Sequence, residues 1–183
     1  EGTAYSDSIA TRLEVDGFLT YMAAQIILGN SDWPDQNVKY WRFTGVPDSA
    51  GVKDGRWRFI MGDSDMGLGF NGGAGVDLFA HLALKRGPVA RLFNACMRNA
   101  QLCARFQAIV LHLLDGPLST TSMAAAIEAQ RALLAPSMPD HIRRWRRPLD
   151  MAMWEARVDE LLTFARQRPA IVREQLRRSF TRP

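Results

Sequence analysis

The sequence is poor in the residues that usually hold small disulfide-rich domains and zinc sites together. It contains two cysteines, Cys96 and Cys103, and three histidines, His81, His112 and His141. The cysteines lie seven residues apart on a predicted helix, a separation of roughly 10 Å, which excludes a disulfide within one straight helix. The histidines fall on different predicted helices without the spacing of metal ligands, so we expect no zinc site.

Other signals are missing as well. No run is apolar enough to span a membrane, and no signal peptide is visible. The nucleophile motif Gly-x-Ser-x-Gly is absent, and the glycine-rich segment Asp63–Gly75 lacks the Lys-Ser/Thr ending of a phosphate-binding P-loop. One short basic run, Arg143–Arg147, has no nucleic-acid-binding motif beside it, so we expect a solvated helix face and no nucleic-acid partner.

The composition is that of a globular domain. The 183 residues are 47% hydrophobic and 23% charged, which is enough apolar material for one buried core. We therefore predict a single domain over residues 1–183. The net charge of +4 could favour ATP or an acidic protein substrate, but it is also common in proteins that bind neither.

Helical periodicity dominates the chain. Apolar residues follow helical spacing from Gly17 to Leu28, and Gly29 is placed to end that helix. Further helices are predicted over Val76–Leu84, Val89–Ala95, Ala100–Leu114, Ser122–Leu134, Pro139–Arg146, Met151–Arg168 and Ala170–Phe180. The candidate N-caps are Asp16, Asn99, Thr121 and Asp150. Pro169 is expected to separate the last two helices, because proline breaks a helix interior.

Two aromatic segments, Val38–Phe43 and Arg56–Met61, are the only strong strand candidates. We expect them to pair as a hairpin through a connector at residues 44–55 that is rich in glycine. The predicted fold class is therefore mainly α with one small β-hairpin.

Acidic and amide residues border this predicted hairpin. The loop Gly29–Asn37 precedes the first strand, and Gly62–Asp65 follows the second. Antiparallel pairing would bring the start of one strand next to the end of the other. The side chains that would then meet are those of Asp32, Asn37, Asp63 and Asp65. Carboxylate and amide oxygens suit a hard divalent cation such as Mg²⁺, so the sequence predicts a metal site at this end of the hairpin.

The spacing of Asp32 and Asn37 is that of a protein-kinase catalytic loop, in which the Asp handles the substrate hydroxyl and the Asn holds a metal ion. Asp63, after a hydrophobic strand, takes the place of the other metal ligand in that scheme. Turn chemistry is the alternative explanation, because Asn, Asp, Pro and Gly also mark loops for backbone reasons alone. Spacing by itself leaves both explanations open.

The residues around these positions resemble a known family. Gly29 to Arg42 reads Gly-Asn-x-Asp-Trp-Pro-x-x-Asn-Val-Lys-x-Trp-Arg, and Trp57 to Gly69 reads Trp-Arg-Phe-Ile-x-x-Asp-x-Asp-x-Gly-x-Gly. Downstream, Pro139–Trp145 matches a Pro-x-His-Ile-x-Arg-Trp segment and Phe164–Pro169 matches Phe-Ala-x-x-Arg-Pro. In this order the motifs resemble the CotH family, the atypical kinases related to spore coat protein H, from about Asp16 to Phe180.

The resemblance implies a fold similar to the C-terminal lobe of a protein kinase. It also implies phosphoryl transfer from ATP to a Ser or Thr of a surface or coat protein. By the family's motif, Asp32 would be the catalytic residue that orients and deprotonates the hydroxyl. Asn37 and Asp63 would hold the nucleotide's Mg²⁺ or Mn²⁺, and Asp65 is a further candidate metal ligand.

A kinase also needs an N-terminal lobe with a strand-borne lysine that grips the nucleotide phosphates. Only about fifteen residues precede the first predicted helix, and the chain begins without Met. We therefore expect a fragment that binds ATP weakly and has little activity alone. One alternative is a non-catalytic assembly or scaffold protein with the same fold, and another is a divalent-metal hydrolase using the same acidic cluster. The compartment is not revealed, although the resemblance favours a cell surface, secretion or a spore coat.

Overall fold

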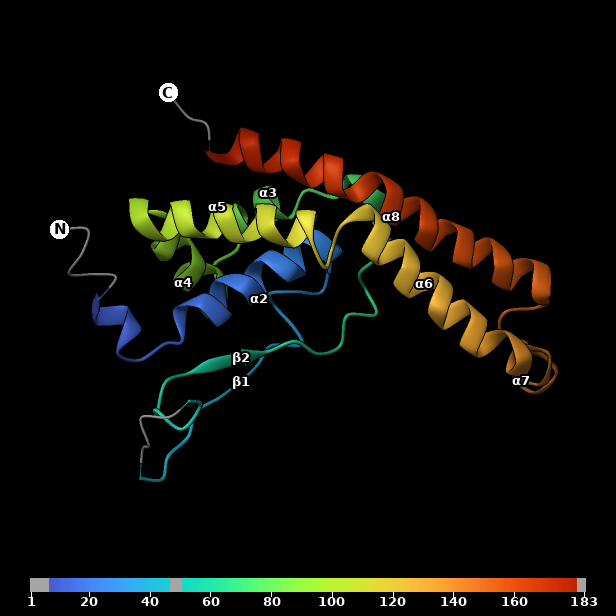
Figure 1. Ribbon diagram of the computed structural model, residues 1–183, viewed down its shortest axis with the longest axis horizontal. Helices are drawn as coiled ribbons and strands as arrows, with labels where there is room; N and C mark the ends of the chain where they lie inside the picture. The colour runs from blue at the N-terminus through green and yellow to red at the C-terminus, as the bar shows by residue number, and fades with distance from the viewer. Residues whose placement is uncertain (1–6, 47–50, 181–183) are drawn as a thin grey trace.

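The computed structural model describes residues 7–46 and 51–180 (Figure 1). Over these residues it is mostly helical with one two-stranded antiparallel sheet, which confirms the predicted fold class. The elements follow one another as α2 (Val15–Leu28), β1 (Lys39–Trp41), β2 (Arg58–Ile60), η1 (Gly73–Gly75), α3 (Leu78–Leu84), α4 (Pro88–Met97), α5 (Ala100–Asp115), α6 (Thr120–Leu134), η2 (Ala135–Ser137), α7 (Met138–Trp145) and α8 (Met151–Phe180). None of the described helices is both long and apolar enough to cross a bilayer.

Helix α2 lies at the centre of the main core. Its side chains Phe18, Met22 and Ile26 have no exposed surface. Helix α5 packs along α2, and helices α3, α4 and the second half of α8 complete the core around them (Figure 1). Gly29, with φ of +69°, ends α2 in the left-handed conformation that glycine adopts without strain. The loop that carries Asp32 therefore starts from the most deeply buried element of the protein.

A second, smaller core lies between α6 and the first half of α8. Trp154, Val158 and Leu162 of α8 pack there against α6. Figure 1 shows these two helices extending away from the main body, with α7 at the far tip. The second half of α8 contributes Val172 and Leu176 to the main core. Helix α8 is therefore the element that joins the two cores.

The prediction that Pro169 separates two helices is wrong, because α8 continues through it. A proline inside a helix costs about 3 kcal/mol, since it removes one backbone hydrogen bond and crowds the preceding turn. Here Arg168 and Val172, on either side of the proline, have no exposed surface. Packing of this turn into the main core outweighs the local cost, and sequence alone does not reveal that packing.

Two of the four predicted N-caps, Asn99 and Asp150, are confirmed by their hydrogen bonds to the first turns of α5 and α8. The predicted caps Asp16 and Thr121 are wrong, because α2 and α6 each begin two residues earlier than expected. The residues that cap these two helices are Glu14 and Ser119.

Strands β1 and β2 pair antiparallel with Lys39 opposite Ile60, as the hairpin prediction requires. Each strand has three residues and is shorter than predicted. Tyr40 lies opposite Phe59, and their ring centroids are 5.7 Å apart. The Phe59 ring also lies 4.9 Å from the ring of Phe18 on α2. This contact attaches the hairpin to the central helix. Residues 47–50 of the predicted connector lie outside the described residues.

Candidate functional site

The hairpin register places the two predicted loops at the same end of the ribbon. Asn37 lies two residues before Lys39, Asp63 lies three residues after Ile60, and Lys39 and Ile60 are partners. The strand pairing on which the site prediction depends is thus confirmed. The individual roles of the four predicted site residues stay predictions.

Hydrogen bonds join the two loops directly. Asn30 Nδ2 donates to the carbonyl oxygen of Asp63 at 3.3 Å. The backbone N–H of Ser31 donates to the carbonyl oxygen of Met66, also at 3.3 Å, and the Ser31 hydroxyl donates to the same carbonyl. Asp32 follows immediately after this contact. The segment before Asp32 and the segment from Asp63 to Met66 are therefore held side by side.

The base of the first loop is fixed by buried side chains. Asn30 Nδ2 also donates to Gln25 Oε1 on α2 at 3.0 Å, and neither side chain has exposed surface. Buried amides are costly unless they are hydrogen-bonded, so this pair favours one position of the loop. Trp33 is fully buried, and its ring lies 6.1 Å from the ring of Tyr21 on α2. Asp32 thus lies between two anchored residues.

Arg168 of α8 ties this region to the rest of the fold. Its guanidinium donates to the carbonyls of Ile26 and Ile27 at 2.6 and 2.9 Å, and to those of Ala74 and Val76 at 2.7 Å each. The first two carbonyls belong to the last turn of α2, where the partial negative charge of the helix end attracts a cation. One buried side chain therefore holds the end of α2 against η1.

The guanidinium is buried without a salt bridge in the described part of the chain. Burial lowers the pKa of Arg168 to about 10, with the Asp77 carboxylate acting in the opposite direction, so the side chain remains a cation at neutral pH. Its central carbon lies 5.8 Å from the centroid of the Phe164 ring. Gln175, two turns further along α8, donates to the carbonyls of Gly75 and Val76 at 3.1 and 3.2 Å. These contacts make the second half of α8 the scaffold of the glycine-rich segment.

Gly67 lets the glycine-rich segment pass close to the end of α2. A Cβ atom there would lie 3.0 Å from the Ser64 carbonyl oxygen and 3.1 Å from the Leu28 carbonyl oxygen. The next residue, Leu68, donates its N–H to the Leu28 carbonyl at 2.7 Å. The lack of a side chain at Gly67 therefore permits the approach that brings this segment against the end of α2 and next to Asn30 and Ser31.

On the other side of the first loop, Asp35 forms an ion pair with Lys85 at the end of α3. A Cβ atom on Gly87 would lie 3.7 Å from Asp35 Oδ1, so the carboxylate lies against the start of α4. His81, one turn before Lys85, is half-buried. Burial lowers the pKa of His81, and the nearby Lys85 cation acts in the same direction while Asp35 opposes it. The loop is therefore held from α3 as well as from α2.

The acidic residues of this region fall into two groups. Asp35 is paired with Lys85, and Asp54 is paired with two arginines of the hairpin at 2.6 and 2.8 Å. Within residues 7–46 and 51–180, no ion pair is found for Asp32, Asp63 or Asp65. Asp63 and Asp65 are exposed, and Asp32 is half-buried. The carboxylates predicted to act in the site are those left available for a cation.

Two of the predicted residues have an uncommon backbone conformation, which Leu68 and Arg146 share. Asn37 has φ of +57° and Asp63 has φ of +47°, both in the left-handed region. Asn and Asp adopt this region more readily than other residues with side chains, yet it remains uncommon. Such conformations concentrate where a fold directs a side chain to a functional site. Here they occur where the chain enters and leaves the hairpin.

A metal cage made of protein side chains alone is not present in the described part of the chain, where no three His, Cys, Asp or Glu residues are close enough to form one. The predicted ligand set is of another kind, because Asn37 would supply an amide oxygen and only Asp63 and Asp65 would supply carboxylates. Mg²⁺ commonly binds through one or two carboxylates together with water and nucleotide phosphates. This donor set therefore fits a cation that arrives with a nucleotide.

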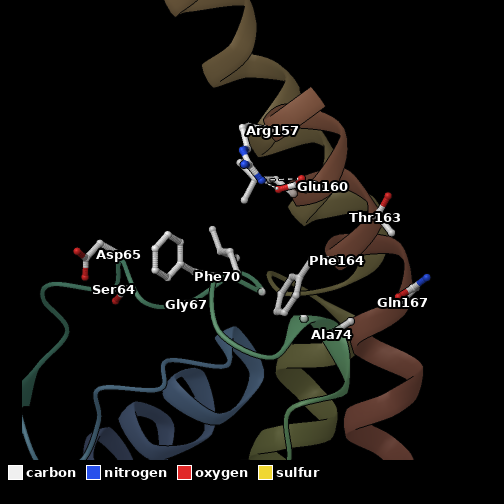
Figure 2. A pocket seen from close by; sticks show the side chains of 14 residues that line it. Ser64, Asp65, Gly67, Phe70, Ala74, Arg157, Glu160, Thr163, Phe164 and Gln167 are labelled. Atoms are coloured by element: carbon white, nitrogen blue, oxygen red, sulfur yellow. Dashed lines mark hydrogen bonds and ion pairs between the residues drawn. The ribbon is translucent and has the colours of Figure 1, made fainter. Parts of the chain in front are cut away.

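A cavity of about 680 Å³ opens beside Asp65, between the glycine-rich segment and α8. Figure 2 shows Asp65 on the loop side and the Arg157–Glu160 ion pair on the α8 side, with the Phe70 ring between them. The ring of Phe164 lines the inner part of the cavity. A volume of this size lies in the range of ligand sites. The cavity therefore provides space for a ligand next to Asp65.

Three residues that organise the site had no role in the sequence analysis. Arg168 lies inside the Phe164–Pro169 motif, and the presence of a charged residue in that motif could have indicated its role. Asn30 directly follows the glycine that ends α2, a position where an amide can bond back to the helix. Lys85 pairs with Asp35 across 50 residues of sequence, and no local pattern marks that contact.

A family profile described as CotH kinase protein matches residues 1–172. No curated protein and no solved structure gives a significant match to the chain. The matched residues include both acidic loops, the hairpin, Arg168 and Pro169.

Proposed function

Because the chain belongs to the CotH kinase family, we propose that it acts in phosphoryl transfer from ATP to a serine or threonine hydroxyl of a protein. The observation that carries this proposal is that hydrogen bonds hold the two acidic loops together. Asn30 and Ser31 hold the segment before Asp32 against the Asp63–Met66 segment. The carboxylates of Asp32, Asp63 and Asp65 have no ion-pair partner in the described part of the chain.

In the proposed reaction, Asp32 orients the substrate hydroxyl and accepts its proton. The hydroxyl oxygen forms a bond to the γ-phosphorus, the bond to the bridging oxygen breaks, and ADP leaves. Asn37 and Asp63 would hold Mg²⁺ or Mn²⁺, and Asp65 is a further ligand candidate. When bound, the metal ion neutralises phosphate charge, which is the main catalytic contribution in this chemistry.

The cavity beside Asp65 supports a polypeptide as the acceptor. Its wall combines the apolar rings of Phe70 and Phe164 with the exposed Arg157–Glu160 pair, a mixture suited to a peptide segment. The proposal extends to an acceptor protein of a cell surface or coat, on the strength of the family resemblance.

The test uses the full-length protein. Phosphate transfer to a protein acceptor should require Mg²⁺ or Mn²⁺ and should fall at least about 100-fold in Asp32→Asn, because a general base commonly supplies a factor of that size. Asp63→Asn should weaken Mg²⁺-dependent nucleotide binding in calorimetry. The matched control is Asp159→Asn, which removes an exposed carboxylate of α8 that is not among the cavity-lining residues. Unchanged transfer in Asp32→Asn and unchanged binding in Asp63→Asn would end the proposal.

A second candidate function is a non-catalytic assembly or scaffold protein. Helices α6 and α7 and the first half of α8 form an arm that extends from the main body (Figure 1). The observation in favour of a scaffold is that two large apolar side chains are exposed at the tip of this arm, Trp145 by 60% and Leu149 by 62%. Large apolar side chains exposed together commonly mark a protein contact. The same calorimetry separates the two functions, since a scaffold should bind no nucleotide in the presence of Mg²⁺.

A further inference from the structure

A basic pocket lies on the side of the protein formed by α4 and the turn that precedes it. The cavity has a volume of about 410 Å³. Four cationic side chains line it, those of Lys85, Arg86, Arg91 and Arg98, and no carboxylate belongs to its lining. The cavity beside Asp65 differs from it, because apolar rings there accompany the carboxylate of Asp65 and the Arg157–Glu160 ion pair.

The helix spacing explains why the charges face the same space. Arg91 lies on α4, and Arg98, seven residues later, caps its C-terminus in helical conformation, so the two lie two turns apart on one face with Asn94 between them. Asn94 Nδ2 donates to the carbonyl oxygen of Leu82 at 3.3 Å, which attaches this face of α4 to α3. The Arg86 guanidinium donates to carbonyls of its own turn. The pocket is thus framed by two helices fixed to one another.

The charges of this pocket are largely uncompensated. Within residues 7–46 and 51–180, no ion pair is found for Arg91 or Arg98, and Lys85 alone has an acidic partner, Asp35. Elsewhere many arginines are matched by a carboxylate, as Arg105 is by Asp16 and Arg173 by Asp115. Like charges gathered around a cavity repel one another, and a bound anion relieves that repulsion.

We propose that this pocket binds a phosphate monoester, with Arg91 and Arg98 as its principal donors and Lys85 and Arg86 at its edge. A guanidinium presents a planar fork of N–H donors that matches two phosphate oxygens. A phosphate monoester carries close to two negative charges at neutral pH and therefore suits several cations better than a single carboxylate does. Its source is a phosphorylated side chain of a protein or a small phosphate compound. Binding at this pocket does not require the phosphotransferase function proposed above.

The pocket is linked to the acidic loop through Lys85. This residue pairs with Asp35, which lies three residues after Asp32 and against Gly87 at the start of α4. A phosphate in the pocket competes with Asp35 for the Lys85 ammonium group. Occupancy therefore weakens one of the contacts that hold the loop, and the loop in turn affects the affinity of the pocket.

Titration calorimetry at low salt tests the assignment with three probes: a phosphoserine peptide, the same peptide without phosphate, and inorganic phosphate. The phosphopeptide should bind, and the double variant Arg91→Gln/Arg98→Gln should weaken its Kd at least about tenfold, the loss of two charged contacts on an exposed surface. The control is Arg146→Gln/Arg147→Gln. It also removes two positive charges, but at the tip of the arm, and should leave the Kd unchanged. All four arginines are exposed, so both variants should keep the native circular dichroism spectrum.

The comparison of probes identifies the source. Tighter binding of the phosphopeptide than of inorganic phosphate assigns a phosphorylated protein segment, and equal binding assigns a small phosphate compound. Asp35→Asn should tighten phosphate binding by a few-fold, because it frees Lys85. The proposal is overturned by equal binding of the unphosphorylated peptide, or by equal weakening in both double variants. Weaker binding in Asp35→Asn would refute the link to the loop.

Discussion

Replacing Arg168 by methionine tests the idea that one buried cation holds the end of α2 and the glycine-rich segment together. Methionine keeps much of the length and apolar surface of the side chain but removes all of its hydrogen-bond donors. Four carbonyl groups lose a bond in this variant. The Ile26 carbonyl still accepts from Gly29 N–H, and the Val76 carbonyl still accepts from Gln175.

The carbonyls of Ile27 and Ala74 have no such second donor among the described contacts. A buried carbonyl left unpaired costs about 1–3 kcal/mol, so two of them cost about 2–6 kcal/mol. Removing the buried cation recovers part of this, since its desolvation is unfavourable, as the lowered pKa of Arg168 indicates. We therefore expect a net loss of about 3 kcal/mol in the free energy of unfolding, against a usual total of about 5–15 kcal/mol.

Urea denaturation followed by circular dichroism measures this loss, and thermal unfolding should show a Tm lower by about 6–12 °C. Hydrogen exchange should show reduced protection of the Asn30 and Leu68 amides, which donate across the region that Arg168 fixes. The control is Arg166→Met on the same helix, because Arg166 is exposed and should change stability by less than about 0.5 kcal/mol. If Arg168→Met does not fold, Arg168→Lys keeps the charge with fewer donors and should give a smaller loss. Stability of either Arg168 variant equal to the parent would refute the reasoning.

Two further predictions concern groups whose pKa is changed by burial. Burial raises the pKa of the Cys96 thiol to about 11. At pH 8 a thiol reagent should therefore modify half-buried Cys103 first, and Cys96 only after unfolding. Equal rates of modification for the two thiols in the native protein would contradict this. Burial lowers the pKa of His81, so below about pH 6.5 the unfolded chain binds more protons at this position and stability falls as pH decreases. Urea unfolding at pH 7.5 and 5.5 should show a smaller decrease in His81→Gln than in the parent, while His112→Gln, which changes an exposed side chain, should behave as the parent does. An unchanged decrease in His81→Gln would remove His81 as its cause.

Much of the fold was predictable because its signals are local. Apolar spacing marked α2, Gly29 marked its end, and two aromatic segments marked the hairpin. Once those strands pair, their register brings Asn37 and Asp63 to the same end, so the position of the two loops follows from strand geometry. The N-caps predicted at Asp16 and Thr121 were wrong by two residues, since several adjacent polar residues can cap a helix and packing selects among them.

The sequence by itself determined which residue types border the hairpin and where the main helices lie, because hydrophobic periodicity and turn chemistry act between near neighbours. Only the tertiary structure decided that α8 continues through Pro169, that Arg168 bonds four distant carbonyls, and that Lys85 pairs with Asp35. These contacts join segments far apart in the chain, and their energies depend on burial that exists only after the cores have formed. Packing therefore determined how firmly the acidic loops are held, while local sequence determined what they contain.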